Sequence, residues 1–428
     1  MHILGAIIVN FFICGILLIE LNRRSTAVFL WVGLLLFFGL SHLYNCIIGS
    51  VYSDILNEAS FFVIFFCMAY LAGRMAFCWI SPHPLLLKSS ATLYETAEPQ
   101  SRQKIVNMLF HIFVFSTIAY VVTLIMFAGT LSAISKATVY AFRAGSLFVL
   151  TISYLWSISV AVTLYFIVKR ERKKVILCFL CIATMSIISF TRTYLIILFV
   201  AIIVYLIFSQ NKIRLKIIVG IFIVAIFAVY AMYLLRGFRY YYSFADIGNI
   251  SFTDINNMAF ALLATRSGDL YMGNFFYGLL EIENNFLGLG IGSGYLRLLL
   301  MPIPSSITFG IKPEDICITL GRLFGSGVAH TAVSYTVTPT LFGDCYANFG
   351  FYGFLMGFVW AVIICIMDRL ASRKTLLFRC LYTLIISSAY INIARGDVYN
   401  AMALIYYATV IYTIIFLFVK LRFNYKSY

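Results

Sequence analysis

Long continuous apolar segments, rather than alternating apolar and polar residues, run along most of the chain. Each is about 16 to 24 residues long, and a helix needs about 20 apolar residues to cross a bilayer. Membrane-spanning strands would instead alternate over about ten residues. The pattern predicts an all-α polytopic membrane protein of about 11 transmembrane helices. The predicted helices cover residues 3–20, 26–48, 60–80, 105–128, 145–168, 175–190, 193–208, 217–235, 349–367, 376–393 and 401–419.

One long, partly hydrophilic segment, residues 236–348, interrupts this pattern. It is too long for a connector and too apolar for a free soluble domain, so we expect it to lie against the outer leaflet. Apolar residues at helical spacing predict short interfacial helices over 254–264 and 270–282. The chain is therefore divided into transmembrane helices 1–8 (1–235), this large loop, and helices 9–11 with the C-terminus (349–428).

Composition agrees with a membrane location and gives the orientation. Hydrophobic residues make up 63% of the chain and charged residues 11%, which excludes a soluble globular domain. A net charge of +15 would suggest nucleic acid in a soluble protein, but here the basic residues cluster between apolar segments. All of these clusters fall on one face, which predicts a non-cytoplasmic N-terminus, a cytoplasmic C-terminus and no nucleic-acid partner. Only Arg74 lies deep in a predicted span.

Arginines on the non-cytoplasmic side are the candidate substrate ligands. Arg192 lies in the turn of a short apolar hairpin, and Arg236 and Arg239 lie at i, i+3 where the helix 217–235 ends. Arg266 and Arg322 follow in the large loop. Guanidinium groups bind phosphate oxygens through paired hydrogen bonds, so such arginines together could hold a diphosphate. The structural alternative is contact with lipid headgroups or nearby acids, or a snorkelling side chain at Arg192.

Other motifs are less informative. The structural alternative is favoured for Arg297 and Arg322. The glycine-rich stretch 288–294 lacks the Lys-Ser/Thr pair and the strand-helix context of a nucleotide loop. The pair Cys317 and Cys345 could meet in the large loop, but a disulfide is not favoured there. No cluster has metal-ligand spacing, so neither a metal nor another cofactor is predicted.

Three segments carry a family resemblance: SFTRTYL at 189–195, NNFLGLGIGSGYL at 284–296 and PTLFGDCYANFGFYG at 339–353. With the single large loop late in the chain, they resemble the O-antigen polymerases, the Wzy family of lipid-linked oligosaccharide polymerases among the C-type glycosyltransferases. Related O-antigen ligases usually carry a His-Asn before such a span entry. Here Pro339 and Thr340 occupy those positions, which favours a polymerase.

The resemblance implies inverting glycosyl transfer at the periplasmic face of the bacterial inner membrane. The growing chain would leave undecaprenyl diphosphate and join the terminal sugar of an incoming lipid-linked repeat unit. The implied partners are this lipid-linked oligosaccharide, membrane lipid, a co-polymerase that regulates chain length, and a flippase.

The expected catalytic residues are His330, Arg266 and Asp269. Preorganised arginines would stabilise the leaving diphosphate without a metal. His330 would act as general base, with Asp269, Glu281 and Asp344 as carboxylate alternatives. The expected diphosphate ligands are Arg192, Arg236, Arg239 and Arg322.

Three other functions remain open from the sequence. An O-antigen ligase would share the hairpin and the loop but use a different acceptor. A flippase or transporter of lipid-linked glycans would share the apolar composition, but should show an internal repeat or several charged spans. A membrane scaffold without enzymatic activity would leave the external arginines unexplained.

Overall fold

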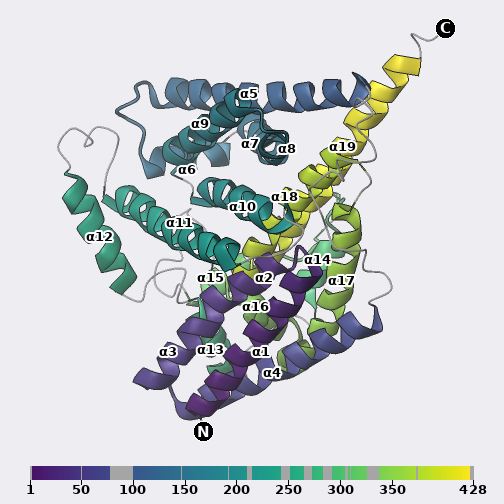
Figure 1. Ribbon diagram of the computed structural model, residues 1–428. Helices are drawn as coiled ribbons and strands as arrows, with labels where there is room; N and C mark the ends of the chain where they lie inside the picture. Colours follow the sequence, from purple (N-terminus) through teal and green to yellow (C-terminus); the bar gives the residue numbers. More distant parts are fainter. Residues whose placement is uncertain are drawn as a thin grey trace. The chain divides into compact units, whose positions relative to one another are not determined.

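The described part of the chain is helical, and no strand occurs in it (Figure 1). This confirms the predicted all-α class. The computed structural model describes residues 2–49, 51–77, 100–145, 147–190, 192–209, 215–241, 251–264, 272–282, 292–303, 307–308, 310–324, 337–372 and 375–424.

Contacts between residues divide the chain into two compact units. The first unit comprises Met1–Leu85, Gly268–Ser372 and Ala389–Ile405, and the second comprises Leu86–Ser267, Arg373–Ser388 and Tyr406–Tyr428. Both contain segments far apart in sequence. The predicted division at residues 235 and 348 follows membrane sides instead and stays a prediction.

Helices of the first unit come from both ends of the chain. They are α1 (His2–Arg23), α2 (Val28–Leu34), the π-helical turn η1 (Leu35–Gly39), α3 (Leu40–Ile48), α4 (Ser53–Ala76), α13 (Gly273–Glu281), α14 (Ser293–Leu299), α15 (Ile316–Phe324), α16 (Thr340–Phe349), the 3₁₀ helix η5 (Gly350–Leu355), α17 (Met356–Ala371) and the adjoining ends of α18 (Leu376–Arg395) and α19 (Val398–Asn424).

Helices of the second unit come mainly from the middle of the chain. They are α5 (Gln100–Ala128), α6 (Lys136–Gly145), α7 (Leu147–Ser159), α8 (Val162–Lys169), α9 (Arg172–Ile188), α10 (Arg192–Phe208), α11 (Leu215–Tyr241), α12 (Phe252–Ala264) and the remainder of α18 and α19. Within this unit, the ring centroids of Trp156 and Tyr194 lie 4.4 Å apart, and Trp156 Nε1 donates to Thr117 Oγ1 at 3.0 Å. These contacts join α5, α7 and α10.

Within the described ranges, eight helical segments are long and apolar enough to cross a membrane. They are His2–Arg23, Val28–Ile48, Ser53–Ala76, Gln103–Ala128, Phe148–Lys169, Thr340–Ala371, Leu376–Arg395 and Val398–Val419. The other three predicted spans correspond to α9, α10 and α11, of which α9 and α10 have 17 residues each. All eleven predicted segments are therefore mainly helical where the structure describes them, whereas eleven complete crossings remain a prediction.

Small residues let α4 and α17 pack closely in the first unit, where α1 and α17 both lie against α4 (Figure 1). A Cβ atom on Gly357 of α17 would come 2.3 Å from the carbonyl oxygen of Phe66 in α4. A Cβ atom on Gly73 of α4 would come 2.8 Å from Ala361 Cβ. Close helix contact through small residues is a common way of packing membrane helices, because it allows many van der Waals contacts.

A buried charged cluster joins α1, α4 and α17. Arg74 donates from Nε to Glu20 Oε1 at 2.8 Å and lies 3.3 Å from Asp368 Oδ2. Asp368 also accepts hydrogen bonds from Ser25 Oγ at 2.6 Å and from the Thr26 amide at 2.9 Å. All five residues are buried. Glu20 and Asp368 thus compensate the charge of Arg74. The hydrogen bonds from Ser25 and Thr26 to Asp368 also fix the turn between α1 and α2.

Candidate functional site

The glycine-rich stretch and the 339–353 segment meet in the first unit. The amide of Gly292 donates to the Asn348 carbonyl at 2.8 Å, and the amide of Gly294 donates to Asn348 Oδ1 at 2.8 Å. Gly292 has a φ of +73°, and a Cβ atom on Gly294 would come 2.9 Å from Asn348 Oδ1. Glycine permits both the left-handed backbone and the close approach. These bonds hold the start of α14 against α16.

Helix α14 carries Tyr295 into the interior of the unit. Trp360 Nε1 donates to the Tyr295 hydroxyl oxygen at 3.2 Å, and Cys345 Sγ lies 3.4 Å from the same oxygen. Burial raises the pKa of Tyr295 well above its ordinary value. The hydroxyl is therefore protonated at neutral pH. Cys345 and Cys317 are both buried free thiols.

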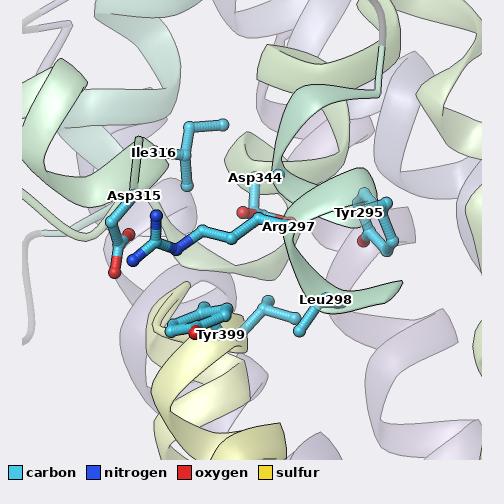
Figure 2. A pocket seen from close by; sticks show the side chains of 9 residues that line it. Tyr295, Arg297, Leu298, Asp315, Ile316, Asp344 and Tyr399 are labelled. Carbon is cyan, nitrogen blue, oxygen red and sulfur yellow. The ribbon is translucent and has the colours of Figure 1, made fainter. Parts of the chain in front are cut away.

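Arg297 follows on the same helix and reaches across the ring of Tyr399. Its guanidinium carbon lies 4.3 Å from the ring centroid, a cation–π distance. Nη1 donates to the carbonyl of Pro313, whereas the buried Nε has no hydrogen-bond partner among the described residues. Figure 2 shows the guanidinium extending toward Asp315 above the Tyr399 ring.

Asp344, on α16, is 2% exposed. Its Oδ2 atom is buried and, within the described residues, accepts no hydrogen bond. Buried carboxylate oxygens without a partner are costly, so they are uncommon outside functional sites or water sites. Asp344 and Arg297 line the same pocket, which also includes Tyr295, Asp315, Ile316 and Tyr399 (Figure 2). We call this site the carboxylate pocket.

Two more carboxylates occupy helix starts at or beside this pocket. Asp315 is 7% exposed, and its Oδ1 accepts the Cys317 amide at 3.0 Å at the start of α15. Asp397 precedes α19, and its Oδ1 accepts Asn400 Nδ2 at 2.8 Å. Burial raises the pKa of Asp397, and the neighbouring charge of Asp315 raises it further. Both side chains cap helices, which gives each a structural role.

The size and charge of the pocket limit its chemistry. Its volume of about 10 Å³ is enough for one water molecule or one hydroxyl group. Among the described residues, two carboxylates and one guanidinium line it, so a neutral hydroxyl fits better than a diphosphate. Asp344 Oδ2 can accept a proton or hydrogen bond there, and Arg297 Nε can donate one. In the described ranges, no group of three or more His, Cys, Asp or Glu residues is placed to hold a metal ion.

The structure brings Arg322 to the surface of α15 rather than to this pocket. Its two terminal nitrogens donate to the two carboxylate oxygens of Glu314, each at 2.8 Å, and its side chain is 69% exposed. This pairing resembles the structural alternative considered for Arg322.

The other predicted site residues cannot be placed at side-chain level. His330, Arg266 and Asp269 lie outside the described residues. Arg192 begins α10, and Arg236 and Arg239 belong to the last turns of α11, but their side chains also lie outside the described part. Their expected roles in catalysis and diphosphate binding remain predictions.

The sequence favoured a structural role for Arg297, and Asp315, Asp397 and Tyr399 were not among the predicted site residues. One signal was available for Asp397: a carboxylate between two apolar segments, next to Gly396. Gly396 has a φ of +97°, and a Cβ atom there would come 2.8 Å from the backbone of Thr340. The turn before α19 therefore contacts the start of α16, which carries Asp344.

Residues 298–407 match the family model described as "Putative O-antigen polymerase". The match confirms the resemblance to this family over a quarter of the chain that includes Asp315, Asp344, Asp397 and Tyr399. No curated protein and no solved structure shows a significant match to the chain.

Proposed function

Because the segment that resembles the O-antigen polymerases also carries Asp344 and most of the carboxylate pocket, we propose that this membrane protein is a polysaccharide polymerase. It joins oligosaccharide repeat units carried on undecaprenyl diphosphate at the periplasmic face of the inner membrane. The observation that supports the proposal best is the coincidence of the family match with a buried carboxylate whose Oδ2 lacks a partner.

The proposed reaction is a single displacement at the anomeric carbon of the donor. The acceptor hydroxyl oxygen attacks this carbon, and the bond to the diphosphate oxygen breaks on the opposite face, which inverts the configuration. The diphosphate leaves with the bonding electrons, and the hydroxyl proton passes to a base. A positioned base typically contributes about 10²- to 10⁴-fold to such a step.

Asp344 is the proposed base. A hydroxyl group fits the space beside its Oδ2, and Arg297 Nε can donate to the hydroxyl oxygen and orient it. Tyr295, whose hydroxyl is protonated, also lines the pocket. His330 and Asp269, the bases expected from the sequence, are the alternatives that mutation must test.

The leaving diphosphate requires more positive charge than Arg297 supplies in the carboxylate pocket, which also contains Asp315 and Asp344. In the proposal Arg192, Arg236, Arg239 and Arg266 supply it from the hairpin, the end of α11 and the large loop. Guanidinium groups held before the reaction would stabilise the charge that develops on the diphosphate. Arg322 contributes less, because its pairing with Glu314 uses both terminal nitrogens.

The surface polysaccharide of cells that lack the gene tests the function. A gel should show core lipid bearing one repeat unit, and expression of the wild-type protein should restore the ladder of longer chains. Loss of every repeat unit would point to a ligase or a flippase instead. An unchanged ladder would contradict a role in polysaccharide assembly.

A further inference from the structure

Helix α13 has one polar face that plays no part in the carboxylate pocket. Asn274, Tyr277, Gly278 and Glu281 follow one another at i, i+3, i+4 and i+7, so they lie on one side of the helix. The opposite side is buried, and the ring of Phe276 there lies 5.8 Å from the ring of Tyr346 on α16. Asn274 and Glu281 on this polar face are exposed, so core packing does not account for them.

This face forms one wall of an open cleft of about 430 Å³. The other wall is the turn between α3 and α4, including Gly49 and Tyr52. Tyr52 is 75% exposed. Binding sites for small organic ligands are typically about 300 to 1,000 Å³, so the cleft can hold a ligand far larger than the carboxylate pocket can.

A buried hydrogen-bond chain supports the α13 wall. Ser60 Oγ donates to the Leu56 carbonyl at 2.8 Å, so its single hydrogen is used there. His42 Nε2, 2.9 Å away, must then donate to Ser60. In the neutral ring Nδ1 is the acceptor, and it receives the hydrogen bond of the Tyr277 hydroxyl at 2.7 Å. These bonds fix Tyr277 against α3 and α4.

A second bond orients the amide at the cleft surface. Asn45 Nδ2 donates to Asn274 Oδ1 at 3.0 Å. The other end of the Asn274 side chain, the Nδ2 donor, is thereby directed away from Asn45. Asn274 is exposed and lines the cleft. The cleft thus presents an oriented amide beside the carboxylate of Glu281.

We infer that this cleft binds a saccharide. Sugars combine hydroxyl groups, which pair with amides and carboxylates, with C–H faces, which stack on aromatic rings. The cleft offers Asn274 and Glu281 for the first kind of contact and Tyr52 for the second. Among the described residues, no Lys or Arg lines it, and the negative charge of Glu281 opposes binding of phosphate or anionic lipid headgroups.

Helix α13 lines the cleft, the carboxylate pocket includes Asp344 of α16, and these two helices pack against each other. Sugars bound in the cleft would therefore lie away from the glycosidic bond being formed. They would belong to one of the two oligosaccharides that are joined. This assignment to a polymerisation substrate rests on the proposed function, whereas saccharide binding itself does not. A binding measurement can consequently fail or succeed independently of polymerase activity.

Binding of the oligosaccharide repeat unit, released from the strain's own surface polysaccharide, tests the inference. The full-length protein in detergent micelles should show saturation transfer to the sugar protons. Tyr52→Ala, Asn274→Ala and Glu281→Gln should each weaken binding about tenfold, as expected for the loss of one stacking or charged hydrogen-bond contact. Tyr352→Ala and Asp54→Asn are matched controls, because Tyr352 is 74% exposed and Asp54 is exposed, and neither lines the cleft.

Two results would overturn the inference. One is no detectable binding of the repeat unit by the wild-type protein, and the other is equal binding by the cleft variants and the controls. Either result leaves the proposed function intact if the gene still restores the polysaccharide ladder. Conversely, the repeat unit could bind specifically while the ladder stays unchanged in the deletion strain. This result would support saccharide binding in the cleft and contradict the proposed polymerase function.

Discussion

A substitution at Asp344 can separate an effect on catalysis from an effect on folding. Asp344→Asn keeps the size of the side chain but removes the proton acceptor. We expect the surface ladder to shorten to one repeat unit, with a rate loss of about 10²- to 10⁴-fold, while the protein level stays near wild type. Gel analysis with an immunoblot measures both quantities.

His330→Gln provides the comparison for Asp344→Asn. If His330 is the base, its substitution should abolish long chains and Asp344→Asn should retain them. That outcome would contradict the role proposed for Asp344. If Asp344 is the base, the His330 variant should retain long chains.

Residue type and spacing do not predict where an individual arginine of the large loop lies in the fold. Arg297 and Arg322 look alike in the sequence, since each follows a short apolar stretch in the large loop. Arg297 lines a pocket because Asn348 holds the start of α14 against α16, whereas Arg322 meets Glu314 at the surface. The contact between Gly294 and Asn348 joins positions 54 residues apart, and no local pattern encodes it, whereas Glu314 and Arg322 are 8 residues apart.

Helices in the first unit depend on a few close approaches and on one buried charge cluster. Replacing Arg74 by alanine would leave Glu20 and Asp368 without their positive partner in a buried site. Removing one member of such a cluster typically costs about 3 to 5 kcal/mol, so Arg74→Ala should lower the thermal stability and the amount of folded protein. Size-exclusion chromatography after heating measures this, and Arg369→Ala, at an exposed position, is the control. A stable Arg74→Ala protein would show that the cluster does not hold these helices together.

Gly357 tests the packing of α17 on α4. An added methyl group would meet the Phe66 carbonyl at 2.3 Å, and a backbone atom cannot move aside as a flexible side chain can. We expect Gly357→Ala to destabilise the protein by about 1 to 3 kcal/mol. Gly15→Ala is the matched control, because no atom lies within 4 Å of the position that its Cβ would occupy. Equal melting temperatures for the two variants would rule out a close contact at Gly357.

The sequence predicted the positions of helices well where the length and spacing of apolar residues alone determined them. The predicted segments 254–264 and 270–282 appear as α12 and α13 within three residues at each end. The predicted span 349–367 instead begins at Thr340, because α16 and the 3₁₀ helix η5 precede α17. A left-handed Gly350 separates α16 from η5, and hydropathy does not register such a break.

For the whole molecule, contacts within the first unit constrain the number of membrane crossings. Arg74, at the end of α4, meets Asp368 at one end of this unit. Tyr277 of α13 meets His42 at the opposite end. If the apolar helices cross the membrane, the chain between α4 and α13 must cross an odd number of times. Among the residues that the structure describes there, Gln103–Ala128 and Phe148–Lys169 are the full-length candidates, so one or all three of α9, α10 and α11 must also cross.

Counted over the described helices, the chain crosses nine times if one of α9, α10 and α11 crosses and eleven times if all three cross. Both totals are odd, so both arrangements place the termini on opposite sides. They differ at the turn between α9 and α10. If all three helices cross, this turn reaches the periplasm, as the predicted role of Arg192 in diphosphate binding requires. If only one crosses, α9 and α10 can form a hairpin that enters and leaves the membrane on the cytoplasmic side, and Arg192 cannot meet a periplasmic substrate.

A cysteine reporter at the hairpin distinguishes these arrangements. We expect Thr191→Cys, in a protein otherwise free of cysteine, to react in intact cells with a thiol reagent that does not cross the inner membrane. Ser132→Cys, in a predicted external loop, is the positive control, and Lys173→Cys, in the basic cytoplasmic cluster, is the negative control. Because both control positions are exposed, differences in labelling reflect membrane side rather than burial. Protection of Thr191→Cys alongside labelled Ser132→Cys would reduce the total to nine crossings and remove Arg192 from the diphosphate site, while leaving Asp344 and the saccharide cleft unaffected.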